Sequence, residues 1–113
     1  MNDLRTQAYP ALSMYIGGRF IGADEREGQP VINPASGKTL GKLPQATKED
    51  LDHALAAAQT AFETWRWSNP MDRSAILRKV AGMVRERAET LAINITRDQG
   101  KPLAEARIEV AGA

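Results

Sequence analysis

Asp98 is the residue whose type and position most strongly suggest a chemical role. In the stretch NITRDQGKPLAEAR, an apolar helical pattern ends on this carboxylate, and Gly100 and Pro102 then form a sharp corner. Unpaired carbonyl groups give the end of a helix a partial negative charge, so a carboxylate there needs a positive partner. Arg97 or Lys101 can supply that charge. A bound cation, ligated by the carboxylate and backbone carbonyl oxygens, is the alternative.

The other reactive side chains do not form a recognisable catalytic set. The chain contains no cysteine, which excludes disulfides, thiolate metal sites and a cysteine nucleophile among these residues. His53 is the only histidine, and no serine or cysteine partner stands near it, so we expect it on a solvent-facing helix surface. The SGKT stretch at 36–39 lacks the upstream glycine of a phosphate-binding loop. We therefore assign no catalytic residue in this chain.

Composition narrows the classes of partner. The 113 residues allow one small domain, and 15 Lys and Arg against 14 Asp and Glu give a formal net charge of +1. That balance gives no reason to expect binding to nucleic acid or to an anionic membrane. No apolar run approaches membrane-spanning length, and the N-terminus lacks the features of a signal peptide. The expectation is a cytoplasmic protein.

The first part of the chain has the pattern of short antiparallel strands. We expect residues 1–13 to form a flexible arm that Tyr9 and Leu12 anchor, followed by a hairpin in MYIGGRFI, where two glycines supply the turn. A second strand pair is expected in VINPASGKTLGKLP, with the Asn-Pro and Ser-Gly pairs as turn residues.

The remainder is helical in pattern. Thr47 is a good N-cap, and Asp50 completes a capping box in its acidic form. A second helix starts at Pro70 and its apolar stripe continues to Ile95, so one uninterrupted helix is predicted up to Gly100. Pro102 suits the first turn of a third. The fold class is thus α+β: two N-terminal β-hairpins followed by two to three α-helices.

Two features indicate that these residues form part of a larger unit. The third helix reaches Ala113 without a capping signal, and short strand pairs need a surface to pack against. We expect the front part of a longer protein, in which 14–113 belong to one domain. The alternative is a free-standing, non-enzymatic helical interaction module with a β-arm.

Three motifs carry a resemblance to a known family. INPASG, AAAQTAFETWR and RDQGKPLAEA occur in the order and spacing typical of the N-terminal part of the aldehyde dehydrogenase superfamily. The resemblance covers the chain from Met14 on. WRWSNPMDRSAILRK and TRDQGKPLAEAR are most similar to the branch that includes succinate-semialdehyde dehydrogenases.

The resemblance implies an activity whose machinery lies beyond Ala113. The family oxidises aldehydes to carboxylic acids with NAD or NADP: a cysteine thiolate forms a thiohemiacetal, hydride passes to the nicotinamide, and a glutamate activates water. Residues 14–113 would be the front of its α/β, Rossmann-like cofactor-binding domain. No catalytic or dinucleotide-binding residue carries over, so this chain alone should be inactive and bind no cofactor. The parent enzyme would be a homo-oligomer, a dimer or a tetramer, acting on an aldehyde such as succinate semialdehyde.

One family site does map onto these residues. Several members bind a monovalent cation, Na⁺ or K⁺, through backbone carbonyls in the strand before Asn-Pro and a carboxylate in the D-x-G-K-P turn. The matching positions are Val31, Ile32 and Asp98. Family members often have threonine where this chain has Val31, and a carbonyl ligand survives that change. The resemblance thus implies that Asp98 and the end of its helix form part of an oxygen-lined site.

Overall fold

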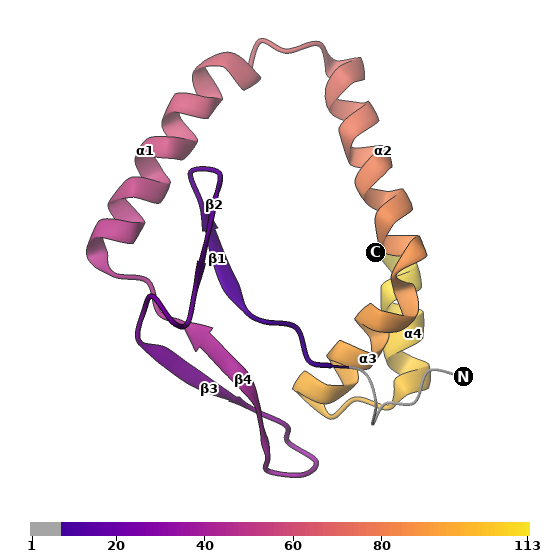
Figure 1. Ribbon diagram of the computed structural model, residues 1–113. Coiled ribbons are helices and arrows are strands. Elements are labelled where there is room, and N and C mark those ends of the chain that lie inside the picture. The colour runs from indigo at the N-terminus through magenta and orange to yellow at the C-terminus, as the bar shows by residue number, and fades with distance from the viewer. Residues whose placement is uncertain (1–7) are drawn as a thin grey trace. The chain divides into compact units, whose positions relative to one another are not determined.

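A computed structural model describes residues 8–113 of the chain. They form two short hairpins followed by four helices (Figure 1). The chain divides into two compact units, each described by itself below. One contains residues 10–31 and 41–69, and the other contains residues up to Tyr9, residues 32–40 and residues 70–113.

The first hairpin has the predicted position and turn. Strands β1 (Ser13–Ile16) and β2 (Arg19–Gly22) pair antiparallel, with Tyr15 opposite Phe20. Both turn glycines have positive φ, a conformation that a side chain disfavours. The Tyr15 and Phe20 rings pack with their centroids 4.8 Å apart on an exposed face, whereas Ile16 and Ile21 are buried.

The second hairpin is built around Asn33. Strands β3 (Gly28–Ile32) and β4 (Thr39–Pro44) form a separate two-stranded sheet, as the sequence predicts. The Asn33 side-chain oxygen accepts hydrogen bonds from the backbone N–H groups of Ala35 and Ser36, and the Asn33 N–H donates to the Lys38 carbonyl at 2.9 Å. These are the local contacts of an Asx turn. The SGKT stretch therefore lies in a strand connection.

Helix α1 (Lys48–Trp65) begins with the predicted capping box. Asp50 N–H donates to Thr47 Oγ1 at 3.1 Å, and Thr47 N–H donates to Asp50 Oδ2 at 3.0 Å. The apolar residues of this helix lie on two faces. Its alanines, with His53, line a groove of about 750 Å³ beside the first hairpin. Its large members are exposed instead: Leu51, Leu55, Phe62 and Trp65.

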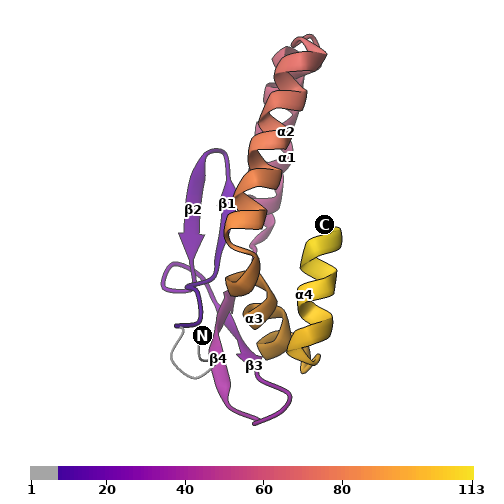
Figure 2. The ribbon, with the colours of Figure 1, turned by 90° about the vertical axis from the view of Figure 1, so that its right-hand side faces the viewer.

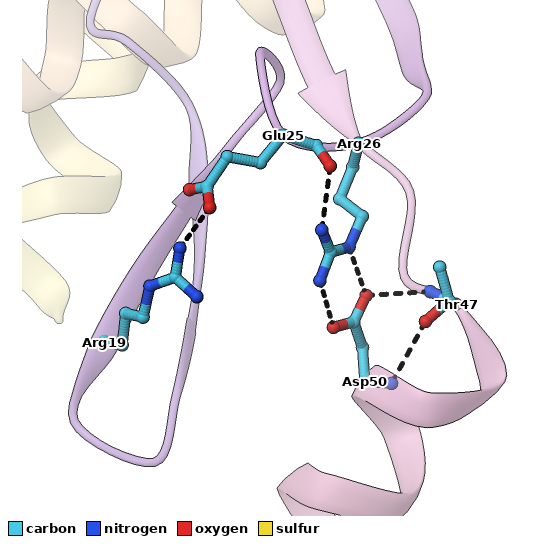
Figure 3. Close-up of polar contacts among 5 residues, drawn as sticks. All are labelled: Arg19, Glu25, Arg26, Thr47 and Asp50. Atoms are coloured by element: carbon cyan, nitrogen blue, oxygen red, sulfur yellow. Dashed lines mark hydrogen bonds and ion pairs between the residues drawn. The ribbon is translucent and has the colours of Figure 1, made fainter.

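A charged clamp joins the loop after β2 to the start of α1 (Figure 3). Arg26 donates from Nε to Asp50 Oδ2 at 2.7 Å and from Nη2 to Asp50 Oδ1 at 2.8 Å, in the two-pronged geometry that suits guanidinium and carboxylate. Asp50 is buried and also receives the Thr47 N–H. The Arg26 guanidinium and the Thr47 N–H hold the pKa of Asp50 well below its usual range. Sequence reasoning identified only the capping half of this arrangement.

Replacing Asp50 by asparagine should lower the thermal stability of the chain in a pH-dependent way. A carboxyl whose pKa is depressed by folding stabilises the folded state above its unfolded-state pKa of about 4, and this contribution is lost as the pH falls below that value. We expect Asp50→Asn to lower the melting temperature by about 5 °C at neutral pH, because Arg26 loses its charged partner.

Circular dichroism melts across a pH series provide the measurement. The gap between wild type and Asp50→Asn should narrow as the pH falls below about 4. Asp52→Asn is the matched control, since Asp52 is an exposed carboxylate two positions along the same helix whose partner is Lys48. A gap of constant size at all pH values would contradict the clamp as its cause.

The predicted long second helix is in fact two helices. Helix α2 spans Pro70–Glu86 and helix α3 spans Ala88–Gln99, with a break at Arg87. The backbone of Arg87 leaves helical geometry, with φ −106° and ψ 12°, and its N–H is shared between the carbonyls of Met83 and Val84. The chain therefore forms four helices, where two to three were predicted. No proline or glycine marks the position, so no local signal predicts the break.

The best-formed core lies between α3 and α4 (Leu103–Gly112), which run side by side (Figures 1 and 2). Ala92 and Ala106 are completely buried, and these small side chains allow the two helices to approach closely. Val84, before the break at Arg87, and Ala88, after it, both pack on this core. The break therefore lets the end of α2 and the start of α3 both contribute to it.

An ion pair on the surface spans the same two helices. Arg107 donates from Nε and Nη2 to the two carboxylate oxygens of Glu89 at 2.9 and 2.7 Å. The Arg107 guanidinium lowers the pKa of Glu89 from its usual value. Both side chains are largely exposed, so the pair orients α4 on α3 more than it stabilises the fold.

Within residues 8–113, no helix is both long and apolar enough to cross a bilayer.

Candidate cation site at the end of helix α3

The corner after α3 is fixed by Gly100. This residue has φ +72° and caps the helix with an N–H bond to the Thr96 carbonyl at 2.9 Å. A Cβ added to Gly100 would lie 3.2 Å from Pro34 Cγ, tighter than most contacts, in a conformation that side chains rarely adopt. Glycine therefore allows the end of α3 to lie directly against the Asn33-Pro34 turn after β3.

Asp98 has an uncharged hydrogen-bond donor as a partner. The hydroxyl of Tyr9 donates to Asp98 Oδ1 at 2.8 Å, across 89 positions of sequence, and both residues belong to the same compact unit. Partial burial and then the negative Asp98 carboxylate raise the pKa of Tyr9 to about 12, so the phenol carries its proton at neutral pH. The predicted anchoring of the arm by Tyr9 thus has a specific contact. Residues 1–7 of that arm lie outside the described structure.

Lys101, one of the two side chains considered as a charge partner for Asp98, has a different contact. Its ammonium group pairs with Glu109 on α4. This pair ties the corner to the following helix. The side-chain hydrogen bond that the structure gives Asp98 comes from the neutral phenol of Tyr9.

A second oxygen that could accept a hydrogen bond or bind a cation lies one helical turn before Asp98. Asn94 Oδ1 is buried and accepts no hydrogen bond from any group in residues 8–113. Positions 94 and 98 are four apart on α3 and so share a face. An amide oxygen without a donor is costly when buried, and it is also the type of ligand that hard cations prefer. The face that carries Asp98 therefore has two side chains, Asn94 and Asp98, whose oxygen atoms are of the types that hard cations bind.

The three residues predicted to ligate a cation are only partly brought together. Ile32 and Asp98 belong to one compact unit, in which the turn two residues after Ile32 contacts the corner two residues after Asp98. Val31 belongs to the other unit, so its carbonyl enters only through the family resemblance. In the part of the chain that the structure describes, no cluster of three or more His, Cys, Asp or Glu side chains is placed to hold a metal ion.

His53 has a structural neighbour. Its side chain is exposed on α1, as expected, and its ring lies beside the first hairpin, where a Cβ added to Gly17 would be 3.1 Å from Nε2. The groove around it is lined mainly by alanine and glycine. Among the described residues that line this groove, none is acidic and none is serine or cysteine.

The comparison with protein families decides the identity of the fold. The profile of the Aldehyde dehydrogenase family matches residues 20–113. The chain belongs to this family. The resemblance inferred from INPASG, AAAQTAFETWR and RDQGKPLAEA is thereby confirmed.

Individual members of the aldehyde dehydrogenase family match over most of this chain. Malonate-semialdehyde dehydrogenase of Bacillus pumilus is 38% identical over 99 residues, which are 88% of this chain and 20% of that enzyme. The crystal structure of succinate-semialdehyde dehydrogenase from Burkholderia pseudomallei has a TM-score of 0.83 at 39% identity, covering 88% of this chain and 21% of that one. A Staphylococcus aureus betaine aldehyde dehydrogenase variant in complex with NAD⁺ has a TM-score of 0.83 at 28% identity, covering 96% and 22%.

These matches define how much of an aldehyde dehydrogenase the chain represents. It spans about a fifth of the length of the curated relatives it matches. The hairpins and helices correspond to the N-terminal part of the solved structures, which confirms the predicted fold class apart from the additional helix break. The match to a succinate-semialdehyde dehydrogenase agrees with the branch suggested by the sequence. The predicted cytoplasmic location stays a prediction.

Proposed function

We propose that this chain is the N-terminal part of an NAD(P)-dependent aldehyde dehydrogenase, in which it serves as scaffold. The observation that supports this most strongly is the family match over residues 20–113, combined with a span of only a fifth of the relatives' length. The complete enzyme would oxidise an aldehyde through a cysteine thiohemiacetal, and succinate semialdehyde is the proposed substrate, because a solved succinate-semialdehyde dehydrogenase is 39% identical to this chain. It would act as a homo-oligomer. We also propose the division of the chain into an N-terminal arm, residues 1–13, and the front of the cofactor-binding domain, residues 14–113.

The gene that encodes the chain provides the direct test. A reading frame that continues past Ala113 should encode a cysteine nucleophile, and the full product should reduce NAD or NADP with succinate semialdehyde. Replacing that cysteine by serine should abolish the reaction. A natural stop codon after Ala113, with a folded product that acts without a larger enzyme, would favour the interaction module instead.

We also propose that the chain supplies half of a monovalent cation site, with ligands from Asp98 and the carbonyls of Val31 and Ile32. Three observations support it: the carboxylate at a negative helix end, the unpartnered Asn94 oxygen on its face, and the contact of Gly100 with the turn after β3. A cation there would neutralise the helix end and stabilise the corner. It would have a structural role, away from the reacting groups.

Removing the carboxylate should reduce cation binding in the full-length enzyme. Thallium(I) is a spectroscopic substitute for K⁺, and its binding can be followed by thallium NMR with K⁺ as competitor. We expect Asp98→Asn to weaken binding by at least about 10-fold, because the site loses a charged ligand. Asp72→Asn is the matched control, since it removes an exposed carboxylate from the first turn of α2 in the same unit. Equal binding by the two variants would rule out a site at Asp98.

A further inference from the structure

The hydrogen bond between Tyr9 and Asp98 can orient the carboxylate as well as anchor the N-terminal arm. Asp98 is an exposed side chain in the last turn of α3, where a carboxylate ordinarily rotates among several rotamers. The Tyr9 hydroxyl, on a half-buried ring, holds Oδ1 at 2.8 Å. A carboxylate has about four lone-pair positions, so one donor fixes its orientation and leaves Oδ2 and part of Oδ1 able to bind a ligand.

The chemical type of the donor matters as much as its position. A lysine or arginine at this place would orient Asp98 and also cancel its charge. A phenol orients the carboxylate while the site stays anionic. The nearby ammonium of Lys101 pairs with Glu109, away from Asp98. The structure thus combines a negative helix end, an anionic carboxylate and a neutral orienting group.

We propose that Tyr9 is a positioning residue for the monovalent cation site at Asp98. It acts through the carboxylate, whose free lone pairs it holds in place, and it thereby couples the segment before β1 to the occupancy of the site. Ligating carboxylates are commonly held by such outer hydrogen bonds, and losing one costs about 10-fold or more in affinity. This inference rests on the proposed cation site and adds the residue that orients its carboxylate.

The test uses the full-length enzyme and two matched tyrosine variants. Tyr9→Phe removes the hydroxyl, and Tyr15→Phe removes the same atom from an exposed ring on the first hairpin. Melting temperatures are measured over a KCl series at constant ionic strength, with choline chloride as the balancing salt. A cation that binds the folded state raises the melting temperature along a saturation curve. We expect the half-saturating KCl concentration to rise about 10-fold in Tyr9→Phe and to stay unchanged in Tyr15→Phe.

The measurement separates positioning from simple structural support. A merely structural role for Tyr9 lowers the melting temperature by a similar amount at every KCl concentration and leaves half-saturation unmoved, which would overturn the inference. A lower half-saturating concentration in Tyr9→Phe would also overturn it, because Tyr9 would then compete with the cation.

Asp98→Asn distinguishes the failure of this inference from the failure of the site itself. If the potassium-specific rise disappears in Asp98→Asn but is unaltered in Tyr9→Phe, the cation site stands and only the role of Tyr9 is refuted. If wild type shows no rise beyond that in choline chloride, the proposed site fails and the inference fails with it. A rise that Asp98→Asn abolishes and Tyr9→Phe shifts to higher KCl supports both.

Discussion

The purified 113-residue chain is expected to form no detectable NADH from NAD⁺ and any aldehyde. The reaction proposed for the complete enzyme needs a thiolate that adds to the aldehyde, and the chain contains no cysteine. The one histidine, His53, packs beside glycine and alanine, and no serine or cysteine is among the described residues that line its groove. Without covalent addition and a bound dinucleotide, the rate should lie at least about 10⁶-fold below that of a complete enzyme.

The assay follows NADH absorbance with succinate semialdehyde and a panel of other aldehydes. The full-length product of the gene is the positive control, and the same product with its cysteine nucleophile replaced by serine is the negative one. Aldehyde-dependent turnover by a pure preparation of residues 1–113 would show that catalytic groups exist in this part of the chain, and the proposed scaffold role would then be wrong.

The isolated chain is also expected to self-associate through its exposed apolar side chains. Four large residues on one face of α1 are each 47–72% exposed: Leu51, Leu55, Phe62 and Trp65. Burying a side chain of this size contributes about 1.5–3 kcal/mol. Contiguous apolar patches of this kind are rare on soluble monomers and mark interaction surfaces. In the proposed parent enzyme, the other four-fifths of the protein would cover such a face.

Sedimentation velocity over a concentration series measures this association. Leu55→Lys places a charge in the centre of the apolar face and should shift the distribution toward monomer. Thr64→Lys adds the same charge to the same helix at an exposed position on the side opposite that face, and should leave the distribution unchanged. A monodisperse wild-type monomer, or equal effects of the two lysines, would show that this face does not drive association.

The sequence alone determined the features that depend on neighbouring residues. The paired glycines of the first hairpin, the Asx turn at Asn33 and the capping box of Thr47 and Asp50 all lie where the pattern predicts. Each arises from backbone conformations or hydrogen bonds that span four residues or fewer, so local composition is sufficient to specify it. The family motifs, spread along the chain in a fixed order, identified the superfamily for a similar reason, because they need no knowledge of packing.

Only the tertiary structure decided the contacts that join distant parts of the chain. The break at Arg87 has no proline or glycine to announce it and reflects packing of residues on both sides against the α3–α4 core. The partner of Asp98 is a tyrosine 89 positions away, and Arg26 reaches Asp50 across 24. Sequence spacing carries no information on such pairs, because folding brings them together by burying apolar surface elsewhere. The negative end of α3 could thus be predicted, whereas the neutral donor that orients its carboxylate could not.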